Sequence, residues 1–174
     1  MAPQPDWAHA PCPACGAPVA GGRAGCQAVY DSLSVSGGLG TLRDLAFDAY
    51  CMQHPDTYCR SAKSYAAHLT RLCCGIEHGG EPKVYRAIQS WLNGAVPLVK
   101  PPVLAQRGAK TIADLQAAGS PADAAGLARA WAEDVWQAYA SQHDLARGWI
   151  QLALTAGEAA RTRPAANRRK ARAE

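Results

Sequence analysis

The apolar residues of this chain are mostly small, and this limits the folds that the chain can adopt. Alanine accounts for 37 of the 174 residues, whereas Ile, Leu and Val together account for 26, and Phe47 is the single phenylalanine. Alanine is the strongest helix former and is depleted in strands. We therefore expect an all-α fold with a thin core that is filled by alanine, leucine and the five tryptophans.

The apolar pattern has a helical period from residue 41 onward. Apolar side chains recur at i, i+3, i+4 and i+7, and Ser, Thr, Pro and Gly residues stand where helices can begin and end. The segment after Ser120 contains Gly126 and Gly148, so it is one long helix or two helices joined by a kink. This pattern predicts a four- to five-helix bundle, with helices over residues 41–54, 61–78, 82–93, 111–118 and 120–156.

The remaining segments lack a continuous apolar face. Residues 1–40 are rich in Gly, Pro and Ala, and we expect an irregular arm with one short helix around residues 27–33. Residues 95–110 contain three prolines and are predicted to form an extended connector within a bundle of residues 41–157. Residues 158–174 form a basic tail that we expect to be disordered.

The positive charge of the chain is concentrated at its C-terminus. The net charge is +4, and residues 161–174 contain six basic residues and one glutamate, a net of +5, which leaves the first 160 residues at −1. Because phosphate neutralisation drives non-specific nucleic-acid binding, we expect such binding only through the tail. The sequence has neither a signal-peptide pattern at its start nor a run of 18 apolar residues. We therefore expect a cytoplasmic protein without a membrane partner.

Cysteine spacing provides the sharpest local motif. Cys12 and Cys15 form a Cys-x-x-Cys pair followed by Gly16, and the chain has seven cysteines, an odd number. Two thiolates at this spacing can bind one tetrahedral ion, and a glycine after the second permits the tight turn. We predict a zinc knuckle with Cys26 as the third ligand. The alternative is a free or redox-active dithiol.

The fourth ligand is less constrained by spacing. We favour His54, because it stands where Pro55 ends the predicted first helix of the bundle. His9, Cys73 and Cys51 remain alternatives.

The same motifs carry a resemblance to a bacterial domain family of unknown function. Members of this family open with Cys-Pro-x-Cys-Gly, place another cysteine a short way on and continue with Asp-x-Tyr-x-x-Gln-His-Pro. The chain has Cys12 to Gly16, then Cys26, then Asp48 to Pro55. The likeness covers roughly residues 11–150. It supports the shared site residues and implies no substrate.

A second set of residues could form a site inside the bundle. Helix bundles build metal and ligand sites from side chains that face one another, although a single histidine on an apolar face is more often a hydrogen-bonded core residue. A buried arginine beside histidine and tryptophan would suit an anionic small molecule. The candidate residues are Asp48, His68, Trp136, His143 and Arg147.

Three functions remain open at this stage. The first is an accessory or small-ligand-binding protein whose arm is held by a structural Zn²⁺ ion, with an unknown small-molecule or protein partner. The second is a metal-dependent enzyme that uses His54, His68 and His143 around an open metal. The third, which is weaker, is nucleic-acid binding through the basic tail.

Overall fold

The computed structural model describes residues 10–37 and 39–162 and is all-α over these ranges, which confirms the predicted fold class. Two 3-10 helices, η2 (Gly40–Leu42) and η3 (Ala140–Gln142), precede α2 and α8. The α-helices are α1 (Gly22–Val35), α2 (Arg43–Gln53), α3 (Pro55–Tyr58), α4 (Ala62–Glu77), α5 (Pro82–Asn93), α6 (Ile112–Gln116), α7 (Pro121–Ala138) and α8 (His143–Thr162).

Helix starts follow the capping residues that the sequence contains. Ser61 accepts a hydrogen bond from the backbone N–H of Ser64 in a capping box at the start of α4. Thr111 and Asp114 form a second capping box on α6, and Ser120 caps α7. Each side-chain oxygen satisfies a backbone N–H that has no partner within the helix.

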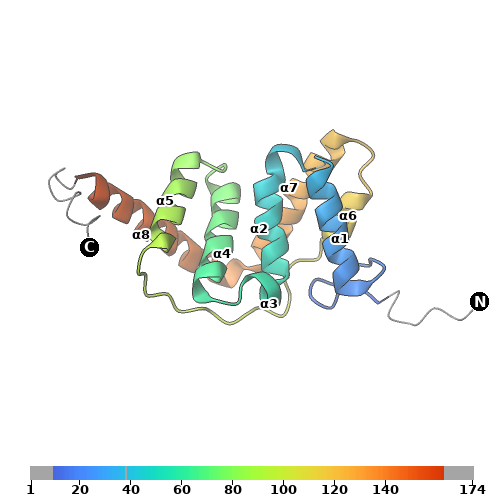
Figure 1. Cartoon of the computed structure of the whole chain (residues 1–174), viewed down its shortest axis with the longest axis horizontal. Coiled ribbons are helices and arrows are strands. Elements are labelled where there is room, and N and C mark those ends of the chain that lie inside the picture. Colours follow the sequence, from blue (N-terminus) through green and yellow to red (C-terminus); the bar gives the residue numbers. More distant parts are fainter. Residues whose placement is uncertain (1–9, 38, 163–174) are drawn as a thin grey trace, which may run out of the picture.

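The helices lie side by side along one elongated molecule (Figure 1). α4 packs between α2 and α8, and α5 packs against both α4 and α8. α7 covers α2, and α6 joins α7 to α1 near the N-terminal end. α2 and α8 are therefore separated by α4, so the first helix of the bundle and its last helix are not neighbours.

Small residues allow the helices to approach closely around a few large ones. Trp131, Trp136 and Tyr139 are buried along α7 and its end. Buried alanines occupy the neighbouring positions, at Ala46 and Ala49 of α2, Ala66 of α4, and Ala128 and Ala132 of α7. This arrangement agrees with the thin core that the composition predicts.

Helix boundaries differ from the sequence prediction at three places. α1 spans 14 residues, whereas the sequence predicted a short helix around residues 27–33. About half of the described part of the N-terminal arm is therefore helical. The long C-terminal segment divides at Tyr139–Gln142, where a 3-10 turn intervenes, and not at Gly126 or Gly148. α8 then continues through Gly157 to Thr162, because a glycine within a helix costs only about 1 kcal/mol and does not end it by itself.

The connector of residues 95–110 has no regular secondary structure, as predicted, but it is held firmly. Gln53 donates hydrogen bonds to the carbonyls of Arg107 and Lys110, at 3.0 and 2.7 Å. The Asp134 carboxylate accepts from the backbone N–H groups of Ala109 and Lys110. The buried Gln53 of α2 and the partly exposed Asp134 of α7 therefore replace the ladder hydrogen bonds that an extended segment lacks.

Two predicted features lie outside the described residues. They are His9, the alternative metal ligand, and residues 163–174, which hold most of the basic tail. None of the described helices is long and apolar enough to cross a membrane.

Candidate metal centre

Four side chains from three separate segments converge at the N-terminal end of the molecule. Cys12 and Cys15 come from the turn before α1, Cys26 from α1, and His54 from the residue that ends α2. One donor atom of each lies within 4.8 Å of all the others. In the described part of the chain, this is the one group of at least three Cys, His, Asp or Glu side chains that could hold a metal ion.

The measured separations are those of donors that surround a common centre. His54 Nε2 lies 3.5 Å from Cys12 Sγ and 3.4 Å from Cys26 Sγ. Cys15 Sγ lies 3.7 Å from Cys26 Sγ. These distances exceed a disulfide bond length of about 2.05 Å, and all seven cysteines of the chain are free thiols. The group is therefore arranged for coordination rather than for cross-linking.

The turn that carries Cys12 and Cys15 depends on Gly16. Gly16 has a φ of 76°, in the left-handed region that favours glycine. Its N–H donates to the Cys12 carbonyl at 2.7 Å, and the Cys12 N–H donates to the Ala17 carbonyl at 2.9 Å. A Cβ atom at Gly16 would meet open space, so the backbone conformation, and not crowding, requires glycine here.

The His54 ring is oriented by the end of α2. Pro55 has no N–H to continue the helix, and His54 adopts a non-helical φ of −120°. Its Nδ1 donates to the Tyr50 carbonyl at 2.7 Å, and the Tyr50 ring lies against it with centroids 4.1 Å apart. This hydrogen bond selects the tautomer whose Nε2 lone pair faces the three sulfur atoms.

Three of the four side chains in this group are removed from solvent. Cys12, Cys26 and His54 are at most 1% exposed, and Cys15 is partly exposed. Hydrogen bonding from the Cys26 thiol lowers the pKa of Cys15 to about 4, and the nearby thiolate together with burial raises the pKa of Cys26. The site thus stabilises thiolate at Cys15 even before a cation is considered.

The other four cysteines have a different environment. Burial raises the pKa of Cys51, and it raises the pKa values of Cys59 and Cys73 to about 12 and that of Cys74 to about 11. Cys51 and Cys73, the alternative fourth ligands, do not belong to the cluster. They are buried thiols of the core.

The five residues proposed for a second site divide into two separate groups. In the first, Asp48 is fully buried and receives hydrogen bonds from His68 Nδ1 at 2.9 Å and Arg71 Nε at 3.1 Å. Burial raises the pKa of Asp48 in spite of these partners. The group joins α2 to α4.

The second group joins α4 and α7 to α8. The His143 ring stacks on Trp136 with centroids 3.8 Å apart, and His143 Nε2 donates to the Trp136 carbonyl at 2.8 Å. Glu77 accepts hydrogen bonds from Arg147 at 2.7 and 2.8 Å and from the Trp136 indole at 3.2 Å. His68 and His143 thus bond to different partners, and neither belongs to the group that could hold a metal ion.

Arg71 and Glu77 complete these two groups, and neither was predicted from the sequence as a site residue. Arg71 is three residues after His68 in α4, so both lie on one helical face. That spacing was a signal that could have identified Arg71. Glu77 contacts residues 59 and 70 positions away, and no local pattern indicates such a pairing.

Comparison with known proteins identifies a family but no activity. A family model described as a family of unknown function (DUF5946) matches residues 10–140, which include all four residues of the cluster. This match agrees with the resemblance to a family of unknown function. Comparisons with curated proteins and with solved structures give no significant match.

Proposed function

The chain belongs to DUF5946, a family of unknown function, and we propose that it is a zinc-binding helical protein in which one structural Zn²⁺ ion is held by the cluster. The ligands are Cys12, Cys15, Cys26 and His54. The observation that carries this proposal is the convergence of three thiols and one imidazole nitrogen within 4.8 Å.

Zinc fits both the donor types and their separations. Tetrahedral Zn²⁺ with zinc–sulfur bonds of about 2.3 Å and zinc–nitrogen bonds of about 2.0 Å has sulfur–sulfur edges of about 3.8 Å and sulfur–nitrogen edges of about 3.5 Å. The corresponding distances in the cluster are 3.7 Å, and 3.4 and 3.5 Å. Thiolate and imidazole ligands favour zinc over magnesium or calcium, which prefer oxygen ligands.

The ligand count favours a structural ion. A catalytic zinc site keeps one coordination position open for water or substrate, whereas a structural site is closed by four protein ligands. Here four protein donors converge and three of them are buried, which leaves a substrate no position on the ion. For this reason we favour the structural function over an enzyme that uses His54 with His68 and His143.

The ion would stabilise the part of the fold that has the least core. α1 buries only Gly22, Cys26 and Tyr30 along its 14 residues. Its Tyr30 ring stacks on the Tyr50 ring of α2, with centroids 4.4 Å apart. A metal ion that joins the turn, α1 and the end of α2 supplies cross-links where apolar burial is small. Seven free thiols are compatible with a reducing compartment, so we propose the cytoplasm.

Metal analysis tests this proposal directly. Protein purified without an affinity metal should contain about one zinc ion per chain, and Cys26→Ala and His54→Ala should each reduce the content to near zero. Cys59→Ala is the matched control, because Cys59 is an equally buried thiol outside the cluster. Cobalt substitution should give the strong visible absorption of a tetrahedral thiolate site in the wild type and in the control.

Two results would overturn the structural-zinc proposal. One is wild-type protein that neither contains zinc nor takes it up from a stoichiometric buffer. The other is a Cys26→Ala variant that binds zinc as tightly as Cys59→Ala. A content of two ions per chain, with one retained in the cluster variants, would instead support a separate catalytic metal.

A further inference from the structure

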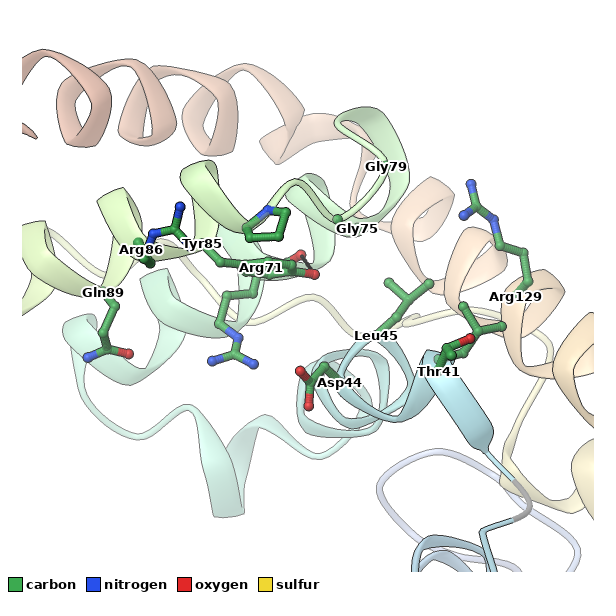
Figure 2. A pocket seen from close by; sticks show the side chains of 13 residues that line it. Thr41, Asp44, Leu45, Arg71, Gly75, Gly79, Tyr85, Arg86, Gln89 and Arg129 are labelled. Atoms are coloured by element: carbon green, nitrogen blue, oxygen red, sulfur yellow. Dashed lines mark hydrogen bonds between the residues drawn. The ribbon is translucent and has the colours of Figure 1, made fainter.

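A cavity of about 590 Å³ opens between α2, α4 and α5, and it shares no lining residue with the metal cluster. Figure 2 shows this pocket from close by, with the turn at Gly79 above it, α5 on one side and the start of α2 below. Its walls also include η2 and one residue of α7. The pocket is therefore built by residues from η2, α2, α4, α5 and α7, together with the turn between α4 and α5.

The charges around this pocket are mainly positive. Arg71 of α4, Arg86 of α5 and Arg129 of α7 line it, and Asp44 at the start of α2 is the one lining residue of negative charge. In Figure 2, Arg86 and Arg129 lie at opposite sides of the pocket, with Arg71 between them. The lining residues thus carry a formal net charge of +2, although Arg71 and Arg129 each also pair with a carboxylate outside the lining, Asp48 and Glu133.

Arg71 is held in place by a residue behind the pocket wall. Its Nε donates to the fully buried Asp48 carboxylate at 3.1 Å, and its guanidinium lies 5.5 Å from the centre of the Tyr85 ring. Within the described residues, its two terminal NH₂ groups have no hydrogen-bond partner. Arg71 therefore presents unused donors from a fixed position, which lowers the entropy cost of binding an anion.

The other two arginines are less restrained. Arg129 pairs with Glu133 on its own helix at 2.7 Å, with a side chain that is 42% exposed. Arg86 is exposed on α5. Both are long side chains on helices that border the pocket.

Apolar side chains also line the pocket, beside the uncharged polar residues Thr41 and Gln89. Leu42, Leu45 and Pro82 line it together with the Tyr85 ring. Gly75 lies so close to α2 that a Cβ atom there would stand 2.6 Å from Leu45 Cδ1. The absence of a side chain at Gly75 thus lets α4 and α2 meet closely at the wall of the pocket.

We propose that this pocket binds a small organic phosphate, with the phosphate on Arg71 and the organic part against Leu42, Leu45 and Tyr85. Three guanidinium groups from three helices suit the three acceptor oxygens and the near-dianionic charge of a phosphate monoester. A carboxylate has only two oxygens in one plane, so it cannot engage donors from three directions equally well.

A titration of the full-length chain with phenyl phosphate tests this proposal, with amide NMR spectra to locate the binding. We expect saturable shifts at Gly75, Gly79 and Gly80, and no such shifts with benzyl alcohol, which has the ring but no phosphate. Arg71→Lys keeps a cation beside Asp48 but loses the planar fork, and it should weaken binding roughly tenfold.

Further variants separate a specific pocket from general charge attraction. Arg86→Gln and Arg129→Gln should each weaken binding about threefold, and Asp44→Asn should strengthen it by a similar factor. Arg60→Gln is the matched control, because Arg60 is an exposed arginine outside the pocket, and it should leave the affinity unchanged. Circular dichroism should confirm that every variant remains helical.

Three outcomes would overturn the proposal. They are shifts confined to the basic residues of the C-terminal tail, no saturation by about 10 mM phenyl phosphate, and wild-type affinity in both Arg71→Lys and Arg86→Gln. Because the variants at Arg86 and Asp44 change exposed groups only, they remain informative if Arg71→Lys fails to fold.

Discussion

His54 Nδ1 lies 2.7 Å from the carbonyl oxygen of Tyr50, one turn earlier in α2. The contact places the ring proton on Nδ1. It leaves Nε2 unprotonated, with its lone pair available to a metal ion beside Cys12 and Cys26. The C-terminus of a helix is thus part of the candidate metal centre, which brings the end of α2 against the turn that precedes α1.

Removal of the metal should loosen the N-terminal part of the molecule and leave the rest folded. After chelation, amide hydrogens of residues 10–35 should exchange faster, because α1 buries only three of its residues. Amides of α4, α5 and α8 should keep their protection, since these helices pack mainly on one another, on α2 and on α7. Hydrogen exchange with mass spectrometry measures both regions in one experiment. Equal protection of residues 10–35 with and without chelator would contradict this prediction.

Gln53→Ala should destabilise the protein and release the connector. The Gln53 side chain is 1% exposed, donates to two connector carbonyls and accepts from the Trp131 indole at 3.0 Å. Loss of these buried hydrogen bonds should cost about 3 kcal/mol of unfolding free energy, which urea denaturation measures. Gln106→Ala, at an exposed position of the connector, should cost nearly nothing.

Limited proteolysis checks the same prediction at the connector itself. Cleavage within residues 100–110 should accelerate in Gln53→Ala and remain slow in Gln106→Ala. Cleavage at the same rate in both variants would mean that the prolines alone restrain this segment.

Two glycine-to-alanine substitutions should have opposite effects. At Gly75 the added Cβ would stand 2.6 Å from Leu45 Cδ1 and 3.3 Å from Tyr85 Oη, so repacking should cost about 1 to 3 kcal/mol. At Gly126 the Cβ meets nothing within 4 Å on an exposed part of α7, so better helix propensity should stabilise by about 0.5 to 1 kcal/mol. Thermal unfolding followed by circular dichroism compares the two. A stabilising Gly75→Ala would show that α2 and α4 can move apart without cost.

The Glu77–Arg147 pair should make stability depend on pH in the acidic range. The hydrogen bond from Arg147 holds the pKa of Glu77 below its ordinary value of 4.5. The unfolded chain therefore takes up a proton at a higher pH than the folded chain does. The pair therefore adds to the free energy of unfolding above the ordinary pKa of Glu77. This stabilisation is lost as the pH falls through the lower pKa of the folded state.

Glu77→Gln isolates this contribution, because it keeps an acceptor for the Trp136 indole. The variant should be less stable than the wild type at about pH 7, and the difference should shrink toward about pH 3. Glu133→Gln, at an exposed i, i+4 pair with Arg129, is the control and should give a smaller difference. A stability difference between wild type and Glu77→Gln that does not change with pH would contradict the prediction that ionised Glu77 stabilises the fold through Arg147.

Local patterns in the sequence were sufficient for the fold class and most of the metal cluster. Alanine content, apolar period and the capping residues at Ser61, Thr111 and Ser120 act over a few residues, so they predict the helices without knowledge of their neighbours. The Cys12 and Cys15 pair and the break before Pro55 are also local features. The position of the break at Tyr139–Gln142 was not evident, because packing decided it and not the glycines.

Tertiary structure alone decided which distant side chains meet. The sequence by itself determined that Asp48, His68 and His143 could each face a helix interface. The packing of α4 between α2 and α8 decided that Asp48 pairs with His68 and Arg71, and that His143 stacks on Trp136. The arginine-lined pocket likewise depends on how α2, α4, α5 and α7 approach one another. Periodicity specifies the face of a helix, whereas the neighbour of that face depends on the packing of the whole chain.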